Sequence, residues 1–251
     1  MSATMRRLAQ LVGLVAILAL GGAVAGNADD ALTAPQAEAV KKLVHDYLLE
    51  HPEVIVDSLK AADERQQAGN QAEQQKVITE RHAELFDDPA SPVLGNPKGS
   101  VTIVEFFDFR CPYCKGMAKD LRDLVQTDGN IRLIYKDFPI LGPASHFASK
   151  AALAAQKQGK YADLHDALMS FKGQINNDVV LDLAKRAGLD VAQLQKDMDS
   201  PDIEAQIRKN YDLAGALKIT GTPGFIIGDS VVDGAMPLDK MKELVAAQRK
   251  S

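Results

Sequence analysis

The two cysteines of the chain, Cys111 and Cys114, have the spacing that most clearly suggests chemistry. They stand in the stretch CPYC, which follows the apolar run VTIVEFFDF that begins at Val101. An unbroken run of β-branched and aromatic residues predicts a strand buried on both faces. Beyond it, apolar residues at helical spacing predict a helix over about 112–125. The cysteine pair is therefore expected where a buried strand passes into a helix.

A thiol at the start of a helix is expected to be reactive. Free backbone N–H groups and the helix dipole favour negative charge there. They can lower the pKa of a cysteine from about 8.5 to between roughly 3.5 and 7.5. Cys111 is then the expected nucleophile, and Cys114, one turn further and more buried, is expected to resolve the mixed disulfide. We therefore favour a redox-active pair.

Two other interpretations of the cysteines are weaker. A zinc site needs four ligands, whereas the chain has no second cysteine pair, and His45 and His51 lie far upstream on either side of a proline. An inert structural disulfide across two residues closes a very small loop and constrains the unfolded chain little. We expect no metal site and no cofactor.

The first residues predict export. Arg6 and Arg7 precede an apolar stretch over 8–20, and the small residues Ala23-Val24-Ala25 fit a cleavage site. The alternative is a membrane anchor, but the apolar run is shorter than the ~20 residues that span a bilayer. We interpret residues 1–25 as a signal peptide, which places the protein in a compartment where disulfides persist.

Composition sets limits on the partners. The net charge of the 251 residues is −5 and 46% of them are hydrophobic. Acidic and basic residues are interspersed, without the basic stripe that nucleic-acid binding requires. We therefore do not expect nucleic acid as a partner.

Residues 26–88 predict a helical arm. An amphipathic helix is indicated by an apolar stripe at helical spacing, with Pro35 in its first turn and Thr33 as its cap. His51-Pro52 predicts its end. The stripe consists of Val40, Leu43, Val44, Tyr47 and Leu48, and a second helix carries Val54, Ile55 and Leu59.

The later part of the arm is mostly polar. The stretch KAADERQQAGNQAEQQK predicts either a solvated helix or a flexible joint. A further amphipathic piece holds Val77, Ile78, Leu85 and Phe86. The arm has too few apolar residues for a core of its own. It must pack on its own catalytic domain or on another copy of the chain, which is a first indication of an oligomer.

Residues 89–251 predict an α/β domain. A Pro/Gly-rich boundary precedes the first strand, and IRLIYKDF is a second buried strand. A helical insertion follows over about 143–217, then a hairpin around Asp229-Ser230 and a last helix from Pro237. The order predicts a sheet whose first two strands are parallel and joined by a crossover.

The segment EFFDFRCPYC resembles the active site of the DsbA-like thiol:disulfide oxidoreductases of the bacterial periplasm. The resemblance runs from about Pro92 to the C-terminus and includes KDFPILGPASHFASKAALAA and GTPGFIIG. It implies a thioredoxin-like fold with an inserted helical domain. It also implies a periplasmic location, unfolded or misoxidised exported proteins as substrates, and a membrane redox partner that resets the cysteines.

The same resemblance implies roles for further residues. Pro223 would be a cis-proline facing the cysteines, so that Thr222 presents its backbone edge to a substrate peptide. Pro112 and Tyr113 would also contact substrate. Glu105 would be a buried acid that exchanges a proton with the resolving thiol, since a buried carboxylate must be paired or protonated. Lys136, on the next strand, is either the partner of Glu105 or a surface lysine.

Two departures from the strong oxidases of this family concern the direction of electron flow. Tyr113 stands where the archetypal oxidase has a histidine. That histidine stabilises the thiolate and so makes the cysteine pair of the oxidase more oxidising. Thr222 precedes the expected cis-proline, as in periplasmic isomerases, where the monomeric oxidase has valine. Both departures favour a weaker oxidant.

The arm joined to a CPYC domain resembles the suppressor-of-copper-sensitivity protein C group. In that group the arm assembles several copies around a shared cleft, which implies a homo-oligomer. We therefore expect an exported enzyme that forms or isomerises disulfides, with oxidase and isomerase both open. The alternatives are a peptide-binding chaperone and a copper- or zinc-binding stress protein that uses the same cysteines.

Overall fold

The computed structural model describes residues 32–249. The signal peptide predicted over residues 1–25 lies outside the described residues. None of the helices in the described part is both long and apolar enough to cross a membrane. The chain divides into two compact units between Leu59 and Lys60.

The first unit contains helix α1 (Ala34–Glu50) and the start of α2 (Glu53–Glu80). Thr33 caps α1, and its backbone N–H donates to the Gln36 side chain at 2.9 Å. The helix ends before His51-Pro52, as predicted. No residue of α1 is buried. Its apolar stripe is exposed to solvent, and Leu43 reaches 68% exposure.

The polar stretch of the arm is a solvated helix and not a joint. α2 continues without a break through Gly69 and Asn70, and the Gln66 side chain donates to Asn70 Oδ1 at 3.0 Å. Of the 28 residues of α2, only Ile78 is buried. This helix therefore forms with little packing, because most of its residues are good helix formers whose side chains are exposed.

The second unit is built on a sheet of five strands in the order β1-β3-β2-β4-β5. β2 (Val101–Phe107) and β3 (Ile131–Asp137) are parallel, as predicted. β4 (Gly224–Ile227) runs antiparallel to β2 and forms the predicted hairpin with β5 (Ser230–Asp233). The sequence did not predict β1 (Val93–Gly95), which pairs with β3 antiparallel, since three residues give no readable alternation.

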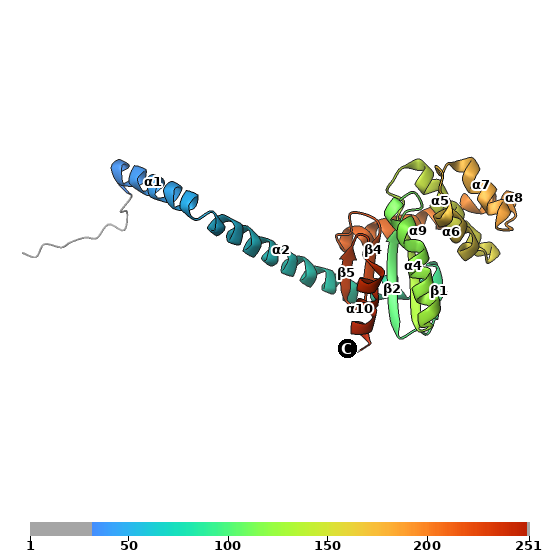
Figure 1. Cartoon of the computed structure of the whole chain (residues 1–251). Helices are drawn as coiled ribbons and strands as arrows, with labels where there is room; N and C mark the ends of the chain where they lie inside the picture. The colour runs from blue at the N-terminus through green and yellow to red at the C-terminus, as the bar shows by residue number, and fades with distance from the viewer. Residues whose placement is uncertain (1–31, 250–251) are drawn as a thin grey trace, which may run out of the picture. The chain divides into compact units, whose positions relative to one another are not determined.

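Helix α4 (Pro112–Asp128) connects β2 to β3 and α10 (Leu238–Gln248) closes the chain. The helical insertion predicted over about 143–217 follows β3 and precedes β4 in the chain, and Figure 1 shows most of its helices grouped together at one end of the sheet. It consists of α5 (Pro143–Ala155), η1 (Gln156–Gln158), α6 (Tyr161–Ser170), α7 (Asn177–Arg186), α8 (Val191–Met198) and α9 (Pro201–Ala216).

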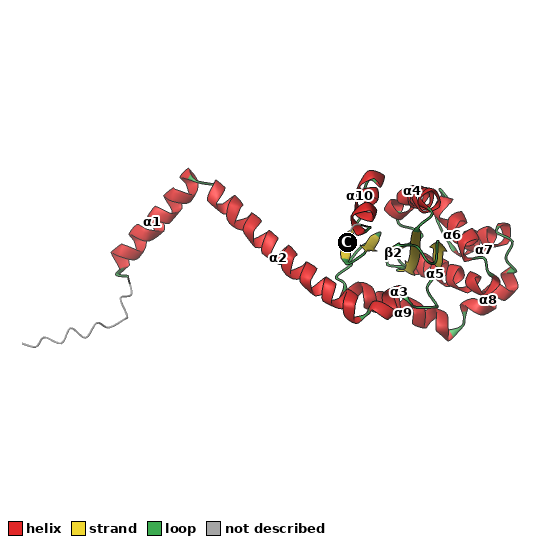
Figure 2. Cartoon of the chain, turned by 90° about the horizontal axis from the view of Figure 1, so that it is seen from below, coloured by secondary structure: helices red, strands yellow, loops and turns green. Residues whose placement is uncertain are grey.

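The sheet is covered on both faces (Figure 2). On one face, Ile103 and Phe107 of β2 pack in a core that includes α4, α10 and the insertion. On the other face, Val104 and Phe106 pack with α9, α3 (His82–Phe86) and the end of α2. The buried residues that come from the expected arm are Ile78, Leu85 and Phe86. This part of the arm packs on the chain's own domain, whereas the stripe of α1 remains uncovered.

Candidate active site

A buried aspartate fixes the turn that delivers the first cysteine. Asp108 follows β2, and its carboxylate accepts from the backbone N–H groups of Arg110 at 2.7 Å and Leu141 at 2.9 Å. Its carbonyl accepts from the N–H of Cys111 at 3.0 Å. Cys111 thereby becomes the N-cap of α4, with Pro112 in the first turn. The sequence analysis missed Asp108, although an aspartate two residues before a turn position is typical of an Asx-turn.

Cys111 lies where its thiolate is stabilised. Both cysteines are free thiols. A hydrogen bond from the Cys114 thiol is the largest cause that lowers the pKa of Cys111, to about 5, and burial opposes it. The Thr222 hydroxyl and the N–H groups at the start of α4 lower it further. The predicted reactive thiol at the helix N-terminus is thus supported by specific donors.

The pKa of Cys114 is shifted in the opposite direction to that of Cys111. It is fully buried on the inner side of α4, and its backbone N–H donates to Cys111 Sγ at 3.5 Å. Burial raises the pKa of Cys114 far above its ordinary value, and the hydrogen bond to Cys111 and the charge of Glu105 add to this. At neutral pH the pair therefore consists of one thiolate and one thiol.

The loop before β4 faces the reactive sulfur. The Thr222–Pro223 peptide bond is cis. The Cys111 thiol donates to the Thr222 carbonyl at 3.1 Å. This contact favours the protonated thiol, whereas the Thr222 hydroxyl favours the thiolate. The hydroxyl outweighs the carbonyl in setting the pKa of Cys111, because a charge-assisted hydrogen bond is the stronger one.

Of the residues expected to contact substrate, Pro112 and Tyr113 are exposed, and Tyr113 reaches 65% exposure. It lines a cavity of about 370 Å³ together with Thr222 and the residues around Gly234. Pro112 lines a different, larger cavity together with Arg110 and Lys115. Three of the residues expected to contact substrate therefore line two separate cavities, whereas Pro223 is buried and lines neither of them.

Glu105 is buried beneath the cysteines, as expected. It lies on the α4 face of β2, beside Tyr135 of β3. Burial is the main cause that raises the pKa of Glu105 to about 8, and the charge of Cys111 contributes. The carboxyl is therefore largely protonated at neutral pH, and only its ionised fraction is able to accept a proton.

Both expectations for Lys136 are wrong. It pairs with Phe106 in the sheet register, so its side chain points to the face opposite Glu105. It is fully buried and not a surface lysine. Its ammonium donates to the Glu84 carbonyl and to Ser91 Oγ, both at 2.7 Å, and lies 3.9 Å from Asp88. The alternation of β3 could have revealed this, since Tyr135 and not Lys136 shares a face with Glu105.

A metal centre finds no support in residues 32–249, where no group of three or more histidine, cysteine or acidic side chains could hold an ion. The chemistry of the site lies in its two thiols. A strand, a CPYC turn and a helix on a mixed sheet, facing a cis-proline loop, define a thioredoxin-fold protein with an inserted helical domain.

The chain belongs to the family of DSBA-like thioredoxin domains, whose model matches residues 102–246. A second model, the copper resistance protein ScsC N-terminal domain, matches residues 36–68 of the arm. The expected α/β fold, with a thioredoxin-like sheet, inserted helices and preceding helices, is confirmed. So is the resemblance to DsbA-like proteins that carry an arm of this kind.

Solved structures agree with both matches. A thioredoxin-like oxidoreductase from Silicibacter pomeroyi DSS-3 is 46% identical, with a TM-score of 0.66 over 67% of this chain and 98% of that one. Proteus mirabilis ScsC in a transitional conformation is 29% identical, with a TM-score of 0.65 over 88% and 99%. The thiol-disulfide exchange protein alpha-DsbA2 from Wolbachia pipientis is 34% identical, with a TM-score of 0.66 over 71% and 97%.

Curated relatives include much longer proteins. The chain is 28% identical over 163 residues to a Na(+)/H(+) antiporter NhaA 1 from Salinispora arenicola, and the match covers 64% of this chain. The chain spans only 25% of the length of that protein and 22% of a second antiporter. The similarity to the antiporters therefore concerns a part of them.

Proposed function

We propose that the chain is an exported thiol:disulfide oxidoreductase that exchanges disulfides in other exported proteins, and that isomerisation is its main activity. The observation that carries this proposal is the opposite displacement of the two thiol pKa values. A pKa of about 5 keeps Cys111 ionised at neutral pH, while Cys114 stays protonated. Attack by one sulfur and resolution by the other need this asymmetry.

We propose that the exchange begins at Cys111. The Cys111 thiolate attacks one sulfur of a substrate disulfide, a mixed disulfide forms and the other substrate sulfur leaves as a thiolate. In isomerisation, that thiolate attacks a further disulfide and the substrate finally displaces Cys111. If the substrate is too slow, Cys114 loses its proton and attacks Cys111, which releases the substrate as a dithiol. We propose that the ionised fraction of Glu105 takes that proton.

The pKa of Cys111 supports a redox pair of intermediate oxidising strength. A thiolate stabilises the reduced form, so a lower pKa makes the disulfide more oxidising. A value of about 5 lies between those of thioredoxin, about 7, and of the strong oxidase, about 3.5. Tyr113 brings no charge to the thiolate. We propose that a membrane redox partner in the periplasm keeps this pair reduced.

The arm supports assembly of several copies. Val40, Leu43, Val44 and Tyr47 form an exposed apolar stripe along α1, which we call the arm stripe. Contiguous apolar surface of this kind marks an interaction site. The match to the ScsC N-terminal domain covers it. We propose that the arm stripe joins copies of the chain, so that their cysteine pairs act on one substrate.

The cysteine roles are tested by two variants of the full chain. Cys111→Ser should abolish exchange with a disulfide substrate. Cys114→Ser should accumulate mixed disulfides that are visible on non-reducing gels. A Cys111→Ser variant with unchanged turnover would contradict the enzyme proposal.

Isomerisation is tested by repair of a protein with scrambled disulfides. We compare the wild type with Leu43→Glu, which places a charge in the arm stripe, and with His45→Glu as a matched control outside the stripe. Leu43→Glu should be monomeric by sedimentation and should repair at least several-fold more slowly, while it still oxidises a dithiol peptide. Equal repair by a monomeric Leu43→Glu variant would favour a simple oxidase.

A further inference from the structure

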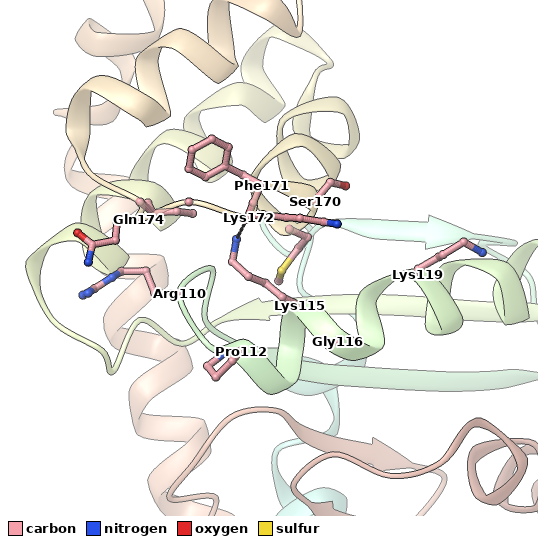
Figure 3. A pocket seen from close by; sticks show the side chains of 12 residues that line it. Arg110, Pro112, Lys115, Gly116, Lys119, Ser170, Phe171, Lys172 and Gln174 are labelled. Atoms are coloured by element: carbon pink, nitrogen blue, oxygen red, sulfur yellow. Dashed lines mark hydrogen bonds between the residues drawn. The ribbon is translucent and has the colours of Figure 1, made fainter.

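A groove beside the cysteine pair carries positive charge. Its volume is about 670 Å³. One wall is a face of α4, formed by residues at helical spacing, namely Pro112, Lys115, Gly116 and Lys119. The facing wall is the end of α6 and the loop after it, residues 169–175 (Figure 3). We call this hollow the basic groove.

Four cationic side chains and no acidic ones line the basic groove. Lys119 is paired with Asp123 on its own helix. Among residues 32–249, the side chains of Arg110 and Lys172 have no carboxylate partner, and the Arg110 guanidinium donates only to the Leu141 carbonyl. The groove therefore holds uncompensated positive charge in a chain whose net charge is −5. A preference for anions at this place cannot come from the overall charge of the protein.

Lys115 holds the two walls together. Its ammonium donates to the carbonyls of Leu168 and Phe171, both at 2.7 Å, and so satisfies carbonyls at the end of α6. Figure 3 shows Lys115 reaching from α4 toward Phe171. Burial lowers the pKa of Lys115. The groove is thus a built feature, in which a half-buried cation fixes the loop of the insertion against the helix of the active site.

The position of the basic groove points to its occupant. Arg110 and Pro112 line it and are the two chain neighbours of Cys111. A polypeptide whose cysteine reacts at Cys111 can therefore extend toward Thr222 in one direction and toward this groove in the other. We infer that the basic groove binds an acidic stretch of the polypeptide that exchanges at Cys111, an inference that rests on the proposed function.

The chemistry of the groove suits such an occupant. A volume of this size lies within the range of ordinary ligand sites and accommodates a few residues. The Arg110 guanidinium can bind a carboxylate in a two-pronged manner, and Lys172 supplies a mobile point charge. A cleft lined by charges of one sign raises the association rate of a ligand of the opposite charge by at least about tenfold. Acidic flanks should therefore speed the reaction mainly through association.

The test uses the full chain with Cys114→Ser, reduced, so that only Cys111 reacts. Three matched peptides each carry one cysteine in a mixed disulfide with nitrothiobenzoate, and their flanks hold glutamate, glutamine or lysine. Attack on the peptide sulfur releases a coloured thiolate. We expect the acidic peptide to react about tenfold faster than the neutral one at low ionic strength. The ratio should approach one in about 1 M salt.

Two pairs of variants localise the effect. Lys172→Glu should lower the acidic-to-neutral ratio at least threefold, whereas Lys98→Glu, the same charge change outside the groove, should not. A Cβ atom added at Gly116 would meet no other atom within 4 Å, so Gly116→Phe should fill the groove and lower the ratio. Gly215 in α9 is equally open, which makes Gly215→Phe the steric control.

The outcomes separate the two proposals. Release of nitrothiobenzoate at equal rates from all three peptides contradicts the proposal that the basic groove binds acidic polypeptide, but it leaves the proposed function standing. An equal loss of the ratio in Lys172→Glu and Lys98→Glu also contradicts the proposal for the basic groove. No release from any peptide contradicts the reactive Cys111 itself, and with it the proposed function.

Discussion

Cys111 and Cys114 are one helical turn apart, yet their pKa values move in opposite directions. Cys111 is only 3% exposed, and donors from Cys114, Thr222 and the start of α4 stabilise its thiolate. Cys114 is fully buried, and burial is the largest cause that raises its pKa, although a backbone hydrogen bond at Asp108 opposes it. Two residues of the same type thus acquire an attacking and a resolving role, because donors stabilise one thiolate and burial keeps the other thiol protonated. Thr222 and Glu105 are the neighbours that adjust this difference.

Thr222→Val is expected to raise the pKa of Cys111. The substitution keeps the shape of the side chain and removes the hydroxyl that stabilises the thiolate. A hydrogen bond to a charged group contributes about 1.5 to 3 kcal/mol, which limits the loss. The ultraviolet absorbance of the thiolate, followed against pH in the reduced protein, measures the shift. Thr220→Val, at an exposed position in the same loop, is the control. An unchanged titration in Thr222→Val would show that the backbone donors suffice.

Glu105→Gln is expected to stabilise the protein increasingly between about pH 4.5 and 8. The folded-state pKa of Glu105 is raised from 4.5 to about 8, so the folded state binds the proton more tightly than the unfolded one. The stability of the wild type therefore falls as pH rises through this window, and glutamine cannot ionise. The difference above pH 8 is of the order of a few kcal/mol. Urea unfolding at several pH values measures it. A difference that does not change with pH would contradict a titrating Glu105.

The same variant should slow resolution by Cys114. Its mixed disulfides should persist longer, as seen by quenched gels, because no carboxylate takes the proton of Cys114. The rate of initial attack by Cys111 serves as the internal control. A gain in stability without slower resolution would leave Glu105 as a strained buried acid with no part in the exchange.

At the level of elements, the parts that follow from local pattern were predictable. The β2 strand, the helix after the CPYC stretch and the hairpin at β4 and β5 each have their own periodicity or turn signal. The partners of Lys136 and Asp108 were not, because Ser91 and Leu141 lie more than thirty residues away from them in the chain. No short-range rule gives such pairs. The sequence also could not tell whether Ile78 and Phe86 pack on the chain's own domain or on another copy, because either surface could bury them.

A buried polar cluster ties α3 and the following loop to the sheet. Asp88 accepts from Lys209 at 3.1 Å and from Gln206 at 3.0 Å, and Lys136 lies beneath it. The segment 78–91 thus belongs to the packing of the catalytic domain. A truncation at residue 88 would uncover Val104 and Phe106, so the function of the arm is better tested by substitutions in the arm stripe.

Lys136→Met is expected to destabilise the domain by about 2 to 4 kcal/mol. Methionine fits the space but leaves the Glu84 carbonyl and Ser91 Oγ without this donor, and Asp88 with one cation fewer. Urea unfolding and limited proteolysis near α3 measure the effect. Lys209→Met is the matched control, since that side chain is one-third exposed and water can replace it. Equal effects of the two variants would contradict a special role of the buried cation.

At the scale of the whole molecule, the two units differ in how much of their apolar surface is buried. The second unit has buried cores on both faces of its sheet, whereas no residue of α1 is buried. A helix of 17 residues is at the margin of stability in water without packing. A partner that covers the arm stripe would therefore stabilise the helix itself. In our proposal that partner is a second copy of the chain.

Folding of the arm should therefore depend on protein concentration. We expect the helical circular dichroism of the full chain to fall on dilution, as copies separate and α1 loses its cover, while the catalytic domain keeps its thermal transition. Leu43→Glu should show the diluted signal at every concentration, and His45→Glu should follow the wild type. Sedimentation on the same samples links the signal to assembly. A helical signal that stays constant while sedimentation shows dissociation would mean that α1 is stable alone, and that the arm stripe serves something other than the joining of copies.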